Sequence, residues 1–250
     1  MGNSIGVVIQ ARTGSSRLHG KVLMPLQKGD TILSYLVKRI SSLGIQTVVA
    51  TTTSEKDDEL AVYLSSNNIP YVRGSEDDVL SRFVLAADYF NLNYIIRICA
   101  DSPFIDKGFL SKLIKIWEQG KKKDYLSFSY QGKPTVLSHF GVFGEIVSVE
   151  ALKKLASTFP ENDFYKEHVT NGIYTNADMF SIELFPFDDV LAPYDGLRFT
   201  VDTLSDYEVI KNISSSVNVE EVNFETIADW AIQQPGILNN MRDNITNNKK

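Results

Sequence analysis

The sequence predicts an α/β fold, a mostly parallel sheet flanked by helices, with a small antiparallel lobe in the second half. Two observations predict it. In the first half, short apolar runs typical of strands buried on both faces alternate with segments whose apolar residues recur at helical spacing. This alternation occurs four times, which favours parallel strands joined by right-handed crossovers. The 250 residues, 43% hydrophobic and 22% charged, are enough to bury a full core in one domain.

Four strand–helix units follow one another in the first half. The expected strands are 5–9, 48–50, 70–72 and 94–98. The helices that follow them are expected at 32–43, 57–66, 78–90 and 107–118. Asp30 is expected to cap the first helix and Gly44 to end it.

After Gly120 the pattern changes. Further strands are expected at 126–130, 142–147 and 180–184, and these either extend the sheet or form a small antiparallel lobe over one edge. A helix is expected at about 149–157, and closing helices at 204–213 and 224–232. The tail from Asn239, rich in Asn and Lys, is expected to fray.

The composition narrows the classes of partner. A formal net charge of -6 argues against a general nucleic-acid binder, and the single cysteine, Cys99, excludes an internal disulfide or a Cys-based metal cluster. No apolar run approaches the roughly 18–20 residues that span a bilayer, and the N-terminus lacks the pattern of a secretory signal. We therefore expect a cytoplasmic protein that binds neither nucleic acid nor membrane.

Small, polar or charged segments follow each of the first four predicted strands. They are residues 10–21, 51–54, 73–78 and 99–103. In an open α/β sheet, ligands bind beyond the carboxyl ends of the strands. The shared placement of these segments therefore predicts a ligand site on one rim of the sheet.

The first of these loops has the composition of an anion-binding loop. Gly14, Ser15, Ser16 and Gly20 allow a tight turn whose backbone N–H groups point at an anion. Three cationic side chains lie within ten residues of one another: Arg12, Arg17 and Lys21. The loop suits a polyphosphate, although it is neither a Walker loop nor a G-x-G-x-x-G fingerprint. The alternative is a solvated basic turn.

Two carboxylates are candidates for a Mg²⁺ site. Asp101 follows the predicted strand 94–98, and Asp202 ends another short apolar run. Magnesium usually takes one or two protein carboxylates and shares its other positions with water and phosphate oxygens. The alternative for either aspartate is to cap the helix that follows it.

These segments together resemble the cytidylyltransferases that make CMP-activated sugar acids, and within them the SpsF-type branch of spore-coat polysaccharide synthesis. The resemblance covers roughly residues 5–215. Residues 9–23 match the opening motif of that branch, with His19 where Pro is usual, and residues 73–80, 97–103 and 200–203 match further motifs. The family includes the CMP-Kdo and CMP-sialic acid synthetases, but the residues just before Asp101 depart from the Kdo enzymes and argue against Kdo as the acceptor.

The resemblance implies a Rossmann-like nucleotidyltransferase that moves CMP from CTP to a sugar acid or similar acidic acceptor, with Mg²⁺ and release of pyrophosphate. It implies that the catalytic residues are Arg12, Lys21 and Asp101. The implied nucleotide-binding residues are Ala11, Arg12, Thr13, Gly14, Ser15, Arg17, Lys21, Thr51, Arg73, Ser75, Asp77 and Asp101. The acceptor-binding residues would be His139 and Arg198, and the metal ligands Asp101 and Asp202.

The organisation implied is a single domain over 1–238, followed by a frayed tail at 239–250. Its parts would be a nucleotide-binding half (1–120), an acceptor and dimer lobe (121–200) and closing helices (201–238). A homodimer is expected, and Tyr125, Phe128 and Tyr130 are either a pairing patch or core residues. Two alternatives stay open: the same chemistry on a phosphorylated small molecule or with another nucleoside triphosphate, and a non-catalytic nucleotide-binding subunit.

Overall fold

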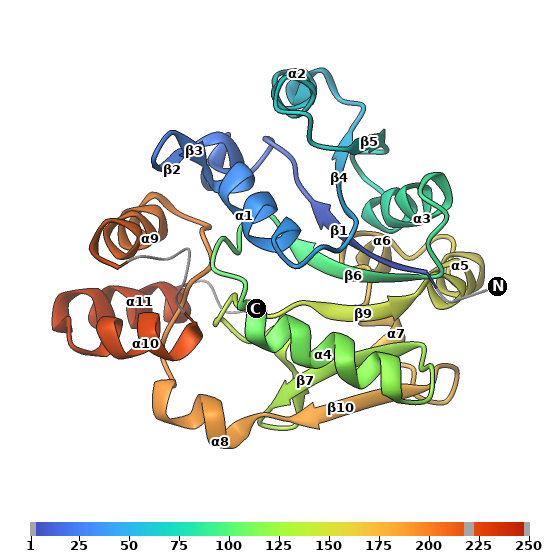
Figure 1. The fold of residues 1–250 in the computed structure, drawn as a ribbon. Coiled ribbons are helices and arrows are strands. Elements are labelled where there is room, and N and C mark those ends of the chain that lie inside the picture. Colours follow the sequence, from blue (N-terminus) through green and yellow to red (C-terminus); the bar gives the residue numbers. More distant parts are fainter. Residues whose placement is uncertain (1–3, 218–222, 248–250) are drawn as a thin grey trace.

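A computed structural model describes residues 4–217 and 223–247 of the chain (Figure 1). Within those residues, eight strands form one sheet in the order β10-β7-β9-β6-β1-β4-β5, with β8 paired to β7, and two more strands, β2 and β3, form a small antiparallel sheet. The strands are β1 (Ile5–Gln10), β2 (Pro25–Gln27), β3 (Asp30–Thr31), β4 (Thr47–Thr52), β5 (Tyr71–Gly74), β6 (Tyr94–Cys99), β7 (Tyr125–Tyr130), β8 (Lys133–Pro134), β9 (Glu145–Ser148) and β10 (Ile182–Pro186).

Helices cover both faces of the main sheet. The α-helices are α1 (Ile32–Ser41), α2 (Asp58–Ser66), α3 (Val79–Tyr89), α4 (Lys107–Gln119), α5 (Val149–Thr158), α6 (Asp163–Glu167), α7 (Asn171–Tyr174), α8 (Asp188–Leu191), α9 (Leu204–Ser216), α10 (Phe224–Ile232) and α11 (Pro235–Asn247). Four short 3₁₀ turns lie between them, at Lys21–Leu23, Glu55–Asp57, Thr135–Leu137 and Ala192–Tyr194.

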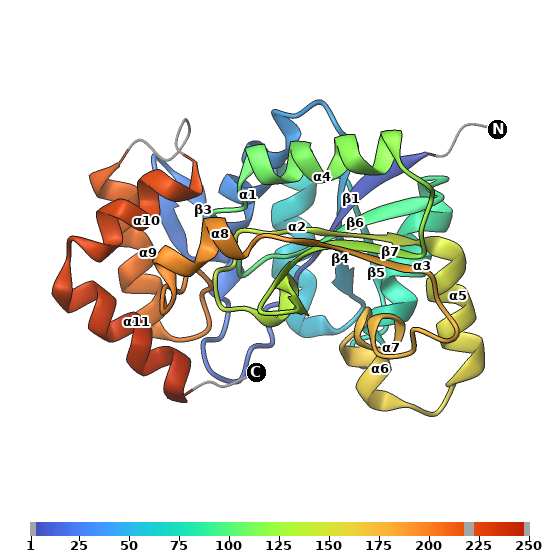
Figure 2. The same ribbon diagram turned by 90° about the horizontal axis from the view of Figure 1, so that it is seen from below.

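Side chains along the central strand β1 point alternately to the two faces of the sheet, and this divides the hydrophobic core into two layers. Val7 and Ile9 of β1 belong to the cluster that includes α1, α2 and α4, whereas Val8 belongs to the cluster with α3 and α5. Successive side chains of a strand point to opposite faces, so a continuous apolar run is what a strand covered on both sides requires. Figure 2 shows α1 and α4 on one face of the sheet and α3, α5, α6 and α7 on the other. The expected fold class is confirmed.

The second-half strands extend the main sheet. β9 runs antiparallel to both β6 and β7, and β10 runs parallel to β7. The antiparallel portion expected in the second half therefore lies inside the sheet and does not form a lobe of its own. The strand expected at 142–147 begins only at Glu145, because Gly141 adopts a φ of 66° and the carbonyl of Val142 accepts a hydrogen bond from the Asp106 N–H.

One smaller expectation was wrong, and one open alternative is decided. Thr31, and not Asp30, caps α1: its side chain accepts a hydrogen bond from the Ser34 N–H, and the Ser34 side chain bonds back to the Thr31 backbone. Tyr125 and Phe128 are at most 1% exposed, so they are core residues and form no pairing patch. Phe128 packs in the core cluster that includes α4, and Tyr125 packs in the cluster that includes α5, so both faces of β7 are buried.

The expectation of a frayed tail was also wrong for residues 239–247, and residues 248–250 of that tail lie outside the described residues. Residues 235–247 form α11, which packs with α9 and α10 beside the carboxyl ends of β1 and β6 (Figure 1). Met241 of α11 is 1% exposed and belongs to the same core cluster as β1. Polar composition alone predicts fraying, but one buried apolar side chain together with tertiary hydrogen bonds is enough to hold this helix.

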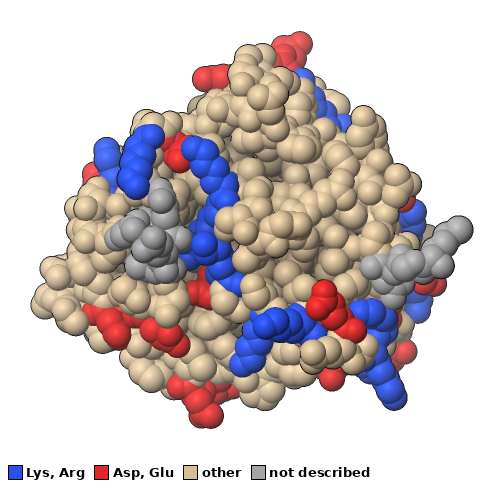
Figure 3. Space-filling model, in the orientation of Figure 1, with Lys and Arg blue, Asp and Glu red and all other residues tan. Residues whose placement is uncertain are grey.

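The molecular surface carries charges of both signs. On the face shown in Figure 3, Lys and Arg side chains are interspersed with Asp and Glu, and no field of one sign covers it. Among the described residues, no helix combines the length and apolar character that crossing a bilayer demands.

The buried position of Met241 generates a prediction about stability. Met241→Ala is expected to lower the free energy of unfolding by about 2–4 kcal/mol, because it leaves a cavity in the core. Asp243→Ala, at an exposed position of the same helix, is the control and should change that free energy by less than about 0.5 kcal/mol. Urea unfolding measures both, and an unchanged Met241→Ala protein would show that α11 does not stabilise the fold.

Candidate active site

A cleft of about 310 Å³ opens at the carboxyl ends of β1 and β6. Gln10 and Cys99, the last residues of these two paired strands, form part of its floor. Its lining residues are Gln10, Ala11, Arg12, Ser15, Ser16, Arg17, Lys21, Val22, Val79, Arg82, Cys99, Ala100, Asp101, Glu167 and Asp202. The cleft therefore brings together most of the predicted phosphate-loop residues with both predicted metal ligands.

The loop after β1 folds back on the carbonyl group of Thr13. That oxygen accepts hydrogen bonds from the N–H groups of Ser15, at 2.7 Å, and Gly20, at 2.9 Å. Gly20 has a φ of 67°, a left-handed conformation that suits glycine, and it leads into the 3₁₀ turn that begins at Lys21. The turn directs the Lys21 side chain into the cleft.

Lys21 lies between the two carboxylates. Its Nζ donates to the carbonyl oxygen of Val201 at 2.7 Å and to Oδ1 of Asp202 at 3.0 Å, and it lies 3.5 Å from Oδ2 of Asp101. Burial acts to lower the pKa of Lys21, but the attraction of Asp101 and Asp202 outweighs it, so the pKa is raised. Lys21 is therefore a permanent cation of the cleft at neutral pH.

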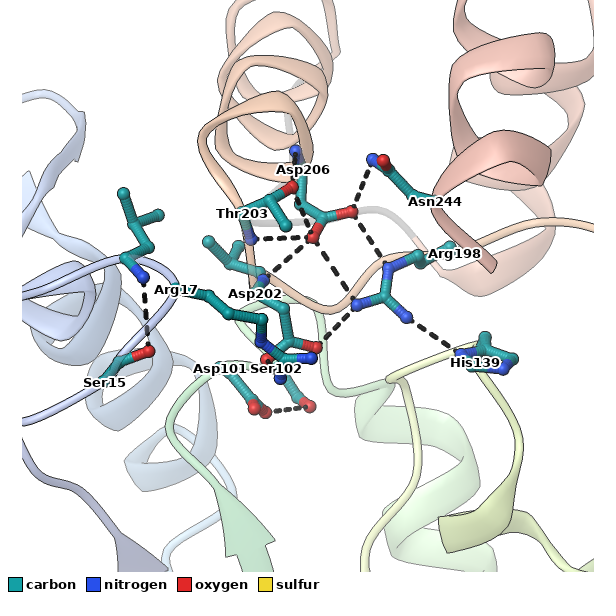
Figure 4. Close-up of polar contacts among 12 residues, drawn as sticks. Ser15, Arg17, Asp101, Ser102, His139, Arg198, Asp202, Thr203, Asp206 and Asn244 are labelled. Carbon is teal, nitrogen blue, oxygen red and sulfur yellow. Dashed lines mark hydrogen bonds and ion pairs between the residues drawn. The ribbon is translucent and has the colours of Figure 1, made fainter. Parts of the chain in front are cut away.

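Three cationic side chains surround Asp202, and Figure 4 labels two of them, Arg17 and Arg198. Its Oδ1 accepts hydrogen bonds from Lys21 and from Arg17, the latter at 2.9 Å, and its Oδ2 accepts one from Arg198 at 2.5 Å. Burial by itself would raise the pKa of Asp202, but Lys21, Arg17 and Arg198 outweigh it and lower the pKa to about 2. The carboxylate is ionised under all ordinary conditions.

A second carboxylate, Asp206, supports this arrangement from behind. Its Oδ2 accepts hydrogen bonds from the backbone N–H groups of Asp202 and Thr203, at 3.0 and 2.9 Å, and its Oδ1 accepts from Arg198 Nε at 2.9 Å. The side chain of Asn244, from α11, donates to the same Oδ1 (Figure 4). Asp206 was not predicted from the sequence, although it occupies the third position of a capping box that begins at Thr203.

The two predicted acceptor residues lie beside each other but off the cleft. Arg198 is 2% exposed, and its guanidinium contacts Asp202, Asp206 and Nδ1 of His139, the last at 2.8 Å (Figure 4). The structure therefore places Arg198 as an internal support for Asp202. His139 lines a separate hollow with Tyr130, Leu137 and Asp195.

Asp57 is a site residue that sequence reasoning missed. Its side chain accepts hydrogen bonds from the N–H and the hydroxyl of Thr13, at 2.6 and 2.7 Å, and from the hydroxyl of Thr52. Asp57 is 2% exposed and comes from the turn after β4, so it ties the phosphate loop to the neighbouring strand. Its position three residues after the polar segment 51–54 is the signal that could have found it.

Arg82 was missed as well. It comes from α3, is 2% exposed and lines the cleft together with Arg12. A buried arginine inside a helix is spaced like a core residue, so helical periodicity does not mark it as part of a site.

The other predicted nucleotide residues occupy different places. Thr13 is buried on Asp57, and Thr51 is fully buried in β4. Arg73 donates to the carbonyl oxygens of Thr52 and Ser54 and to Asp58, and it is absent from the cleft lining. Gly14 belongs to the loop but is also absent from the lining.

Ser75 and Asp77 line a second hollow, of about 630 Å³, beside the first. Arg12, Val79 and Glu167 line both hollows and so join them. The predicted loop 73–78 therefore contributes to the same side of the sheet as the phosphate loop, next to Arg12 but apart from Asp101.

Comparisons with known proteins point to one family. A sequence profile described as cytidylyltransferase matches residues 6–241. The chain is 33% identical over 217 residues to the spore coat polysaccharide biosynthesis protein SpsF of Bacillus subtilis, covering 84% of this chain and 85% of that protein. It is 29% identical over 129 residues to the 3-deoxy-manno-octulosonate cytidylyltransferase of Rickettsia canadensis, covering 49% and 50%.

The solved structures include a similar protein over nearly the whole length. A cytidylyltransferase from Leptospira borgpetersenii superposes with a TM-score of 0.80 at 26% identity, covering 94% of this chain and 96% of that one. The profile match, the relative at 33% identity and the strand-end cleft lead to one conclusion: the chain is an enzyme of the cytidylyltransferase family.

Proposed function

We propose that this enzyme transfers CMP from CTP to a sugar acid or a similar acidic small molecule, releases pyrophosphate and uses Mg²⁺. The similarity to SpsF, named for spore coat polysaccharide biosynthesis, supports a role in supplying surface polysaccharide or glycoconjugate synthesis. The partial similarity to a 3-deoxy-manno-octulosonate cytidylyltransferase supports a sugar acid as the class of acceptor.

One observation carries the proposal. Lys21, Asp101 and Asp202, which are far apart in the sequence, meet through a single ammonium group in the cleft, and Arg12 and Arg17 line the same space. A cleft that combines cations for phosphate oxygens with carboxylates is suited to phosphoryl-group chemistry. A solvated basic turn would not place Lys21 in contact with two aspartates.

The residues suit nucleotidyl transfer because that reaction needs positioning and charge neutralisation more than a covalent protein intermediate. An acceptor oxygen attacks the α-phosphorus of CTP, and the bond from that phosphorus to the bridging oxygen breaks. Arg12, Arg17 and Lys21 would hold the phosphate oxygens and offset the negative charge that develops on the departing pyrophosphate.

The donor set fits Mg²⁺. Carboxylate oxygens are the ligands that this ion prefers, and Asp101 lines the cleft with 27% of its side chain exposed. Asp202 could join it if Arg17, whose side chain is 51% exposed, moved from Oδ1 onto a phosphate group. Among the described residues, no cluster of three or more His, Cys, Asp or Glu is arranged as a metal cage, so phosphate and water would complete the coordination. A bound Mg²⁺ would neutralise phosphate charge at this position.

The acceptor would enter on the other side of Asp101. Asp101 also lines a small hollow of about 70 Å³ with Thr135, Ser138, Gly141 and Thr200. Ser138, which lines this hollow, is the neighbour in sequence of the predicted acceptor residue His139, and His139 itself does not line it. The hydroxyl groups of the hollow are suited to the hydroxyls of a sugar acid.

A pyrophosphate-release assay tests the reaction and its specificity. The purified enzyme is incubated with each nucleoside triphosphate, Mg²⁺ and a panel of sugar acids, phosphorylated sugars and neutral sugars. We expect release with CTP and a sugar acid only. Equal release with other triphosphates or with phosphorylated acceptors would contradict the proposed specificity, and no release with any combination would contradict the proposed activity.

Two substitutions test the roles of the cleft residues. Asp101→Asn and Lys21→Ala are each expected to lower kcat about 100-fold or more, because each removes one electrostatic stabiliser of the transition state. Lys153→Ala, at a surface ion pair with Asp88 far from the cleft lining, is the control and should retain normal turnover. Normal turnover in either cleft variant would remove that residue from the mechanism.

The low pKa of Asp202 predicts how stability depends on pH. Because its pKa falls from an ordinary 3.8 to about 2 on folding, its contribution is fully present above pH 3.8 and is lost as the pH falls through about 2. Asp202→Asn is expected to lower the free energy of unfolding at pH 7 by about 3–5 kcal/mol, since three cations lose their buried partner.

Urea unfolding from pH 7 down to pH 2 measures this effect. The difference between Asp202→Asn and the unaltered enzyme should narrow below pH 3.8, while Asp88→Asn, at an exposed ion pair, should differ little from the unaltered enzyme throughout. A difference that stays constant with pH would show that the charge of Asp202 is not the source of the effect.

A further inference from the structure

Two arginines face the cleft without a carboxylate bound to them. Arg12 makes no hydrogen bond or salt bridge to any described residue, and it lies on the wall shared by the two adjoining hollows. Arg82, from α3, lines the first of these hollows and interacts electrostatically with Arg12. In contrast, the charges of Arg17, Lys21 and Arg198 are all paired with Asp202.

The hydrogen bonds of Arg82 are incomplete. Its Nη1 donates to the carbonyl oxygens of Ser75 and Glu76, the latter at 3.1 Å. Its Nε is fully buried and has no partner among the described residues. Its Nη2 also makes no hydrogen bond to a described residue and is not among the fully buried unpartnered atoms, and Arg82 lines the cleft.

The electrostatic environment of Arg82 is that of a cation that lacks its counter-charge. Burial lowers the pKa of Arg82, and the positive charge of Arg12 lowers it further. Asp57, Asp78 and Glu76 attract the guanidinium, but none of their carboxylates bonds to it. A buried charge without a partner is costly, and two like charges beside each other add to the cost. An anion between them would remove both penalties.

We propose that Arg12 and Arg82 together form a subsite for a phosphate group of the nucleotide's polyphosphate chain, with Arg82 as a direct phosphate ligand. The inference rests on the proposed function and adds a residue from α3, outside the loop after β1. Arginine suits this position because its planar fork lets one nitrogen hold the protein while another binds a phosphate oxygen.

The same geometry couples phosphate binding to the adjoining loop. Arg82 Nη1 holds the carbonyl groups of Ser75 and Glu76, while Nη2 makes no hydrogen bond to a described residue and the residue lines the cleft. An anion that fixes the guanidinium would therefore also fix the loop at residues 75–78. The subsite links the phosphate cleft to the hollow that Ser75 and Asp77 line.

Calorimetric titration with inorganic pyrophosphate, without metal, tests the subsite in the full-length enzyme. Arg82→Met and Arg12→Met should each weaken pyrophosphate binding about 10- to 100-fold, the effect of losing a hydrogen bond to a charged group. Arg39→Met is the control: Arg39 is also a buried arginine that donates to a carbonyl oxygen, that of Ile105, but it does not line the cleft. The affinity of the Arg39→Met variant for pyrophosphate should stay within about twofold of that of the unaltered enzyme.

A structural role for Arg82 gives a different pattern. If Arg82 only holds residues 75 and 76, Arg82→Met would leave pyrophosphate affinity unchanged, which would overturn the proposal. Arg82→Lys retains a charge and one donor but loses the fork, so it should weaken pyrophosphate binding less than Met does. This variant decides the question if Arg82→Met fails to fold, since unchanged pyrophosphate affinity in Arg82→Lys would also contradict the proposal.

The result of the pyrophosphate titration can be distinguished from the result of the CMP-transfer assay. Pyrophosphate binding needs neither CTP nor an acceptor, so an Arg82-dependent affinity can be observed in an enzyme that fails to transfer CMP. Conversely, CMP transfer with Arg82-independent pyrophosphate binding would leave the proposed function standing and remove the subsite.

Discussion

The ion-pair network around Asp202 is the interaction on which the site depends. Its members come from the loop after β1, the loop after β6 and the segment before α9. Lys21, from the first of these, contacts the second through Asp101 and the third through Asp202 and the Val201 carbonyl. Buried charges are stable only when they are paired and hydrogen-bonded. Each side chain in the network therefore constrains the backbone that carries the others, and the shape of the cleft follows from that mutual constraint.

The C-terminal third of the chain supports the cleft through Asp206. This carboxylate binds the backbone at 202 and 203, the guanidinium of Arg198 and the side chain of Asn244 in α11. The helices α9 to α11 are thus more than a cover for one end of the sheet. They set the direction of the Asp202 carboxylate, which in turn sets the position of Lys21.

The cleft of this acidic protein contains two regions that differ in how their charges are paired. Around Asp202, cations and carboxylate neutralise one another, which makes a firm scaffold at any ordinary pH. Around Arg12 and Arg82, positive charge is left without a bound carboxylate, and this is the part of the cleft that an anionic ligand completes. Asp57 adds a third element by holding Thr13, so that the loop between these two regions is already folded before a ligand binds.

Sequence patterns were sufficient to predict the strands and helices of the first half. They were also sufficient to predict the family and the convergence of Arg12, Lys21 and Asp101 on one rim of the sheet. Apolar periodicity reports which faces are buried, and chain direction in a parallel sheet places every strand-end loop on the same side. The same patterns predicted a frayed tail where the structure has α11, because the contacts that hold Met241 and Asn244 are tertiary. The sequence also did not decide which arginine meets which carboxylate. Only the tertiary structure showed that Arg198 supports Asp202 and that Arg82 reaches the cleft, because a hydrogen-bond partner is set by position in space and leaves no periodic trace along the chain.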